Sequence, residues 1–142
     1  MNRNQKGFTL MEMLIVVAII AVLVAIAIPT FTAQLHKARV AADWANVRAY
    51  YAQIQADYML TGEINKTIPV EENLDAIPSF DYKTIRFLDG ATVKLQAGIY
   101  WVVFNDEDGD KRSGYTVAYQ YSNGEETCVK IFGDAREEQP TP

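Results

Sequence analysis

The residues of this sequence whose types and spacing could support chemistry begin with one acidic run. Asn105-Asp106-Glu107-Asp108-Gly109-Asp110 places four acidic side chains within six residues, and three of them, Asp106, Asp108 and Asp110, alternate. Carboxylate oxygens at alternating positions are ligands that Ca²⁺ prefers, so the run has part of the pattern of a calcium-binding loop. It departs from an EF-hand, which would need glycine at Lys111 and a bidentate glutamate further on. We therefore favour a simple acidic hairpin tip and no cofactor, with calcium binding at Asp106, Asp108 and Asp110 as the alternative.

The sequence contains few other residues that could act in catalysis. The chain has one histidine, His36, and one cysteine, Cys128, so it offers neither a multi-histidine metal site nor an internal disulfide. Any nucleophile and base arrangement would have to include His36, which lies in a long helical pattern. We therefore expect a protein that is not an enzyme. We expect Cys128 to be a small buried strand residue, with a dimer-forming or reactive thiol as the alternative.

A single glutamate, Glu12, interrupts a strongly apolar segment near the N-terminus. The 21 residues from Phe8 to Ile28 include only two polar ones, Thr9 and Glu12. At about 1.5 Å per residue, a helix of that length spans roughly the 30 Å hydrocarbon layer of a membrane. A charge in lipid costs at least about 2.5 kcal/mol on insertion scales, so an ionisable residue there indicates a function.

The flanking charges predict the orientation of this segment. Arg3 and Lys6 precede it and no acidic residue lies before Gly7, so the positive-inside rule places the N-terminus in the cytoplasm and the chain after Pro29 outside. A secretory signal cleaved near Ala25-Ile26-Ala27, or a plain single-span anchor, would also explain the hydrophobicity. Neither alternative accounts for Glu12.

The N-terminal sequence resembles the class III signal of the type IV pilins and of the pseudopilins of type II secretion. The matching residues are Lys6-Gly7-Phe8-Thr9-Leu10-Met11-Glu12, the apolar run Met13 to Ala21, and Pro29. The leader of seven residues is similar to that of the type IVa and pseudopilin branch. The resemblance covers about the first 30 residues.

The resemblance implies how the chain is processed and assembled. A prepilin peptidase would cut after Gly7 and methylate Phe8, and the subunit would pass from the cytoplasmic membrane, through a membrane-embedded assembly platform, into a surface filament. Glu12 would pair with the amine of Phe8 on a neighbouring copy, with its own Phe8 amine as a competitor. The partners would be further copies and other pilins. Adhesion, motility and DNA uptake are roles such filaments serve, and a type II secretion pseudopilin is the alternative.

Beyond Pro29 the helical pattern continues as an amphipathic helix that we expect to end before Gly62. Proline removes a backbone hydrogen bond, so we expect a kink or local opening near residues 25–29. Apolar residues recur at steps of four and three, which predicts a stripe that packs on a sheet rather than a ligand platform: Val40, Trp44, Val47, Tyr51, Ile54 and Tyr58. The same pattern places a set of charged residues off the stripe: Lys37, Arg39, Asp43, Arg48 and Asp57.

The C-terminal half of the sequence predicts β-structure. Residues 63–79 form a loop, either a solvated connector or a surface for lateral contacts, and a short hairpin covers 83–95 across Asp89-Gly90. Three aromatic and β-branched runs, 99–104, 115–121 and 127–132, predict an antiparallel meander, the last two joined through Asn123-Gly124. We therefore expect an α+β fold, in which a long N-terminal helix packs on a four- or five-stranded antiparallel sheet.

These patterns divide the chain into four parts: a cleaved leader at 1–7, a transmembrane and polymerisation helix at 8–29, the amphipathic half of the helix at 30–62, and a globular β domain at 63–142. The 142 residues suffice for one core and an anchor. The formal net charge of -5 argues against a specific nucleic-acid partner.

Overall fold

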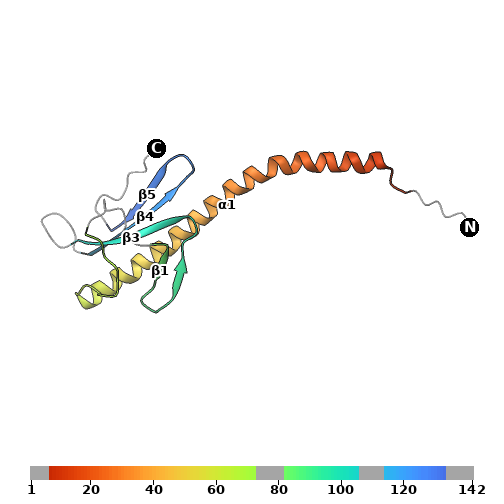
Figure 1. The fold of residues 1–142 in the computed structure, drawn as a ribbon. Coiled ribbons are helices and arrows are strands. Elements are labelled where there is room, and N and C mark those ends of the chain that lie inside the picture. The colour runs from red at the N-terminus through yellow and green to blue at the C-terminus, as the bar shows by residue number, and fades with distance from the viewer. Residues whose placement is uncertain (1–6, 73–81, 106–113, 134–142) are drawn as a thin grey trace, which may run out of the picture. The chain divides into compact units, whose positions relative to one another are not determined.

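The computed structural model describes residues 7–72, 82–105 and 114–133. One long helix is followed by short antiparallel strands (Figure 1), which confirms the predicted α+β class. The chain divides into two compact units, residues 1–37 and residues 38–142, and the helix contributes to both. In chain order the elements are α1 (Leu10–Thr61), β1 (Thr84–Arg86), β2 (Thr92–Lys94), β3 (Gly98–Asn105), β4 (Gly114–Ser122) and β5 (Thr127–Phe132).

The end of α1 follows the predicted capping chemistry. Gly62 has a positive φ of 70°, which glycine adopts without a side-chain clash, and its N–H donates to the carbonyl of Tyr58 at 2.8 Å. This bond satisfies one of the carbonyls that a helix leaves open at its C-terminus. The helix therefore ends at Thr61, as the sequence predicted.

In the described parts of the chain, five strands form two sheets, a β1–β2 ribbon and a β3–β4–β5 meander. Val102 faces Val117, and Ala118 faces Ile131, in the two antiparallel registers of the meander. The predicted strands are all present, but they do not join into one continuous sheet. The physical reason is that the edge of β3 left open by β4 bonds to residues outside β1 and β2. The Glu71 N–H donates to the carbonyl of Val102, and the Tyr100 N–H donates to the carbonyl of Tyr82.

The face that α1 buries in the second unit differs from the predicted stripe. Its buried residues follow steps of four, three and four: Asp43, Val47, Tyr50 and Ile54. The predicted members Val40, Trp44, Tyr51 and Tyr58 flank this face and are partly buried. The prediction that Asp43 lies off the buried face is wrong, since only 1% of its surface is exposed.

Both faces of the meander are buried, and successive side chains along each strand point to opposite faces. Tyr100 and Val102 lie in the main core with α1, whereas Trp101 and Val103 belong to a second cluster with Ala118. Cys128 on β5 is half-buried rather than fully buried, because β5 lies at the edge of the meander. The expectation of a buried thiol is corrected accordingly.

Candidate assembly site

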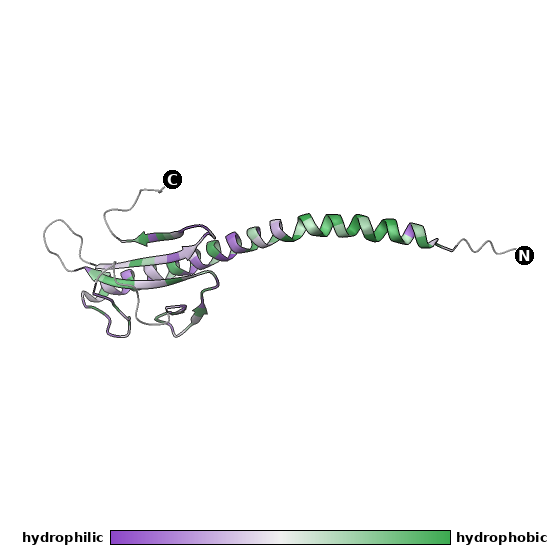
Figure 2. Cartoon of the chain, turned by 45° about the horizontal axis from the view of Figure 1, so that its top comes forward, coloured by the Kyte–Doolittle hydropathy of each residue, from purple (hydrophilic) through white to green (hydrophobic). Residues whose placement is uncertain are grey.

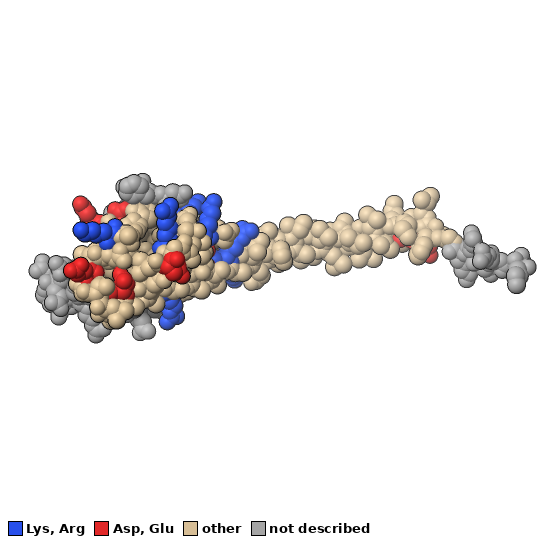
Figure 3. Space-filling view, turned by 90° about the horizontal axis from the view of Figure 1, so that it is seen from below, with Lys and Arg blue, Asp and Glu red and all other residues tan. Residues whose placement is uncertain are grey.

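The N-terminal part of α1 is an apolar surface that nothing in its own unit covers. The large apolar side chains from Phe8 to Phe31 are between 44% and 92% exposed. Figure 2 shows this part of the helix in the colour of hydrophobic residues, and Figure 3 shows it nearly free of charged side chains on the face in view. By length and composition, α1 is the single helix among the described residues that could cross a membrane. Such a surface requires lipid or protein around it.

Glu12 closes the start of this helix through a reciprocal pair of contacts with Thr9. The Thr9 N–H donates to Glu12 Oε2 at 2.8 Å, and the Glu12 N–H donates to Thr9 Oγ1 at 3.2 Å. The Thr9 hydroxyl also donates to Glu12 Oε2, at 3.0 Å. This arrangement is a capping box, in which two side chains satisfy two of the N–H groups that a helix start leaves open.

The capping box gives Glu12 a role that the sequence analysis missed. The signal was present, because a threonine followed three residues later by glutamate, ahead of an apolar run, is the sequence pattern of this cap. The box occupies Oε2, while Glu12 Oε1 accepts no hydrogen bond from a described residue. One carboxylate oxygen therefore stays open to a second donor.

Gly7 and Phe8, the predicted processing residues, lie ahead of α1 in non-helical backbone. Phe8 is 80% exposed, and apart from the chain neighbours of Gly7 no atom of a described residue lies within 4 Å of the position that a Cβ on Gly7 would occupy. Processing at the Gly7–Phe8 bond stays a prediction.

Pro29, the third predicted assembly residue, lies inside an unbroken α1. Of the expected kink or local opening near residues 25–29, the opening is absent, while a kink stays a prediction. Two neighbouring hydroxyls bond to helix carbonyls there. Thr30 Oγ1 donates to the carbonyls of Ala27 at 2.9 Å and Ile26 at 3.2 Å, and Thr32 Oγ1 donates to that of Pro29 at 2.9 Å. None of these bonds goes to the carbonyl of Ala25, which loses its helical partner because Pro29 has no N–H.

The predicted calcium ligands Asp106, Asp108 and Asp110 lie outside the described residues, so calcium binding there stays a prediction. In the ranges that the structure does describe, no three His, Cys, Asp or Glu side chains gather closely enough to hold a metal ion.

Asp43 is the polar residue with the largest structural role that sequence reasoning missed. Its carboxylate accepts N–H bonds from three successive residues of the β2–β3 turn: Gln96 at 2.8 Å, Ala97 at 2.7 Å and Gly98 at 3.2 Å. The hydroxyl of Tyr119 also donates to it, at 3.1 Å. Four donors around one carboxylate compensate for its burial and attach both sheets to α1.

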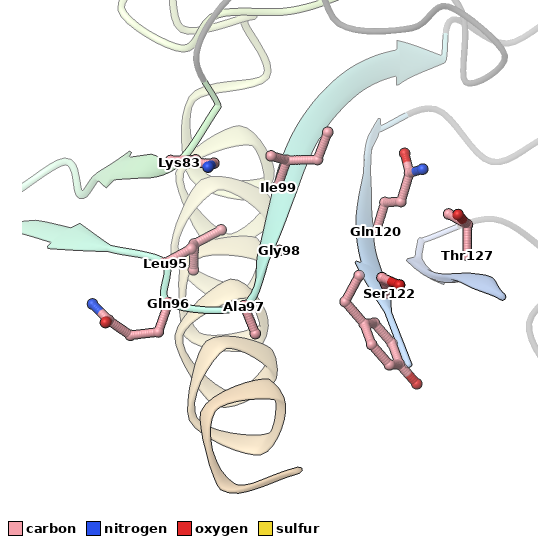
Figure 4. Close-up of a pocket in the computed structure, with 10 residues that line it drawn as sticks. Lys83, Leu95, Gln96, Ala97, Gly98, Ile99, Gln120, Ser122 and Thr127 are labelled. Carbon is pink, nitrogen blue, oxygen red and sulfur yellow. The ribbon is translucent and has the colours of Figure 1, made fainter. Parts of the chain in front are cut away.

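The turn that Asp43 holds lines a cavity of about 250 Å³ between the ribbon and the meander. Figure 4 shows Gln96 and Ala97 on this turn, where it passes α1, with Lys83 and Ile99 beside it. None of the predicted site residues lies in this cavity. It therefore adds no chemistry to the assembly site.

Comparisons with known proteins cover part of the chain. Residues 2–28 match the family model described as the prokaryotic N-terminal methylation motif. The chain is also similar to the type IV narrow pilus major component PilA5 of Thermus thermophilus, at 54% identity over 50 residues. That match covers 33% of this chain and 43% of the relative, so the aligned part spans less than half of the relative's length. No solved structure matches the chain.

Proposed function

We infer that this chain, whose N-terminal segment carries the methylation motif of the type IV pilin family, is a structural subunit of a type IV pilus or of a related filament. The observation that carries this inference is the exposed apolar length of α1, which holds one charged residue, Glu12, between Phe8 and Phe31. Lipid can cover that surface before assembly and the helices of other copies can cover it afterwards, so the hydrophobic effect is satisfied in both states. A structural subunit of this kind needs no catalytic residues.

We further propose that maturation takes place at the Gly7–Phe8 bond. Cleavage by a prepilin peptidase would leave Phe8 as a new N-terminus with a positive charge, one turn ahead of Glu12. The Thr9 N–H and hydroxyl use Oε2 of Glu12, so the free Oε1 is available to the Phe8 amine of a neighbouring copy. Pairing the two charges favours assembly over isolation in lipid.

The experiment that tests this function has two readouts on the chain produced in a cell with a prepilin peptidase. Mass spectrometry of the purified mature protein should show that it begins at Phe8 and carries one extra methyl group. Electron microscopy of material sheared from the same cells should show filaments that an antibody to the β domain labels. A mature chain that begins elsewhere, or the absence of labelled filaments, would contradict the proposal.

A pseudopilin of type II secretion is the second candidate, because the seven-residue leader fits both branches. Deletion of the gene separates the two roles. Loss of surface filaments with normal export of secreted proteins supports the pilin, whereas loss of export with unchanged surface filaments supports the pseudopilin.

A further inference from the structure

Two adjoining cavities in the second unit form a groove that the assembly role does not use. Their volumes are about 480 Å³ and about 620 Å³. Both are lined by the same four residues from α1, the loop that follows it, and β1: Tyr50, Thr67, Thr84 and Arg86. We call this the Tyr50 groove. Its size suits a small organic molecule of one or two rings.

Tyr50 itself is the unusual member of the groove. Its side chain is 1% exposed, and its ring is held edge-on by Phe87 at 5.8 Å and by Tyr100 at 5.6 Å between ring centroids. Its hydroxyl nevertheless has no hydrogen-bond partner in the described part of the chain. Two neighbouring tyrosines do have partners: Tyr100 donates to the carbonyl of Thr84, and Tyr82 donates to the carboxylate of Glu71.

Among the described residues, the fully enclosed polar side-chain atom without a partner is Trp101 Nε1, so the Tyr50 hydroxyl is not fully enclosed. Tyr50 lines both cavities, where its hydroxyl can donate to a ligand that carries an oxygen acceptor. The hydroxyl therefore indicates what one end of a ligand could offer.

Arg86 supplies a positive charge that a ligand of the groove could pair with. It is exposed on β1, lines both cavities, and forms no ion pair or hydrogen bond with any described residue. Its positive charge acts on the Tyr100 hydroxyl and opposes the rise that burial causes in the pKa of that group. A guanidinium offers a planar fork of donors that matches a carboxylate in two parallel bonds.

The walls between these two groups are mainly aromatic and hydroxylated, and one cavity is also lined by the carboxylate of Glu71, which accepts the Tyr82 hydroxyl. Tyr82 and Tyr100 line one cavity and Phe87 lines the other, with Thr67 and Thr84 common to both. A bare inorganic anion would satisfy Arg86 and leave the aromatic walls uncovered. A neutral ring would cover the walls and leave the guanidinium unpaired.

We propose that the Tyr50 groove binds a carboxylated sugar, with the carboxylate on Arg86, the sugar ring against the aromatic walls, and a sugar oxygen accepting the Tyr50 hydroxyl. This binding takes place within the second unit and does not depend on polymerisation. The protein would therefore recognise an acidic polysaccharide or glycan through its globular part.

The test is isothermal titration of the full-length chain, solubilised in a detergent that has no sugar headgroup. The probes are D-glucuronate, D-glucose and acetate. Glucose has the ring without the carboxylate, and acetate has the carboxylate without the ring. Saturable binding of glucuronate, with much weaker binding of both other probes, is the expected result. Failure of glucuronate to bind, or equal binding of either other probe, overturns the proposal.

Variants locate the binding in the groove. Arg86→Gln should weaken glucuronate binding by about tenfold or more, and Tyr50→Phe by about threefold or more, because each removes a hydrogen bond to the ligand. Lys94→Gln is the matched control, since Lys94 is an exposed cation on the neighbouring strand β2 and lines neither cavity. Tyr50→Phe should leave the melting temperature unchanged or higher, because no internal hydrogen bond is lost. Unchanged affinity in Arg86→Gln, or an equal loss in Lys94→Gln, contradicts the assignment.

Discussion

The hydroxyl of Tyr119 on β4 donates a hydrogen bond of 3.1 Å to the carboxylate of Asp43 on α1, across 76 positions of the chain. The same carboxylate binds the N–H groups of Gln96, Ala97 and Gly98. One side chain thus connects the helix, the turn between the two sheets, and the central strand of the meander. A buried carboxylate surrounded by four donors specifies this arrangement, because no apolar side chain could satisfy them.

Replacing Asp43 should destabilise the second unit strongly. We expect Asp43→Ala to lower the free energy of unfolding by about 3 kcal/mol or more, because it leaves several buried donors without an acceptor. Asp43→Asn should also destabilise the unit, since its amide NH₂ would face donors. The measurement is denaturant unfolding of the full-length chain in micelles, followed by the fluorescence of Trp44 and Trp101.

Asp89→Ala is the control for this comparison. Asp89 Oδ1 accepts one N–H bond, from Ala91, at an exposed turn, so its loss should cost about 1 kcal/mol or less. Equal unfolding free energies for the Asp43 and Asp89 variants would show that Asp43 does not have the role described.

Glu12 variants can separate its role in the helix cap from its proposed role between subunits. Glu12→Gln keeps an oxygen that can accept the Thr9 N–H, but it removes the negative charge. We expect filament yield to fall by about tenfold or more, because a charged hydrogen bond contributes roughly 1.5–3 kcal/mol. Membrane insertion should be unchanged. The readouts are quantitative immunoblots of sheared filaments and of the membrane fraction.

Thr9→Val weakens the cap and leaves the charge of Glu12 in place. It removes the hydroxyl that contacts Glu12 but keeps the carboxylate, so most filament yield should remain. Normal yield from Glu12→Gln combined with low yield from Thr9→Val would assign the whole effect to capping and none to pairing between subunits.

Gly98 occupies a position where a methyl group has no room. A Cβ there would lie against the backbone oxygen of Gln120 and 2.5 Å from the Tyr119 ring. Gly98→Ala should therefore lower the unfolding free energy by about 1–3 kcal/mol, as overpacking does elsewhere. Gly7→Ala in the uncleaved precursor, where apart from the chain neighbours of Gly7 no atom of a described residue lies within 4 Å of the added carbon, should leave it unchanged. If Gly98→Ala had the same unfolding free energy as the parent, the packing of Gly98 against Gln120 and Tyr119 would be less tight than described.

The buried tyrosines predict loss of stability at alkaline pH. Burial raises the pKa of Tyr100 from 10.0 to about 12, against the opposing charge of Arg86. Below pH 10 the folded and unfolded states both keep the proton. Between pH 10 and 12 the unfolded state releases it first, so stability falls as pH rises through this window.

Tyr100→Phe should make that fall shallower by up to about 1.4 kcal/mol per pH unit, the linkage for one proton. Unfolding free energies measured from pH 7 to pH 12 provide the comparison, and both proteins should be insensitive to pH between pH 7 and pH 9. A variant whose stability falls as steeply as that of the parent would exclude Tyr100 as one of the groups responsible.

Local sequence patterns were sufficient to predict the long helix and most of the strands. The end of α1 at Thr61 follows from Gly62, and the β4–β5 hairpin follows from Asn123-Gly124, because these residues act on the backbone beside them. The resemblance of the N-terminal segment to type IV pilins is confirmed for the same reason, since its motif lies within residues 2–28. The capping box of Thr9 and Glu12 was equally local and could have been predicted.

By itself, then, the sequence determined the apolar segment with its single acid, the long helix, and the strands with their turns, because each depends on neighbours along the chain. Tertiary structure alone decided which side of α1 is buried, with Asp43 and Tyr50 inward and Trp44 and Tyr51 at its margin. It also decided that the five strands form two sheets. Both outcomes depend on hydrogen bonds between groups far apart in the chain, such as those from residues 96–98 to Asp43 and from the Glu71 N–H to the Val102 carbonyl. Local periodicity carries no information about such partners.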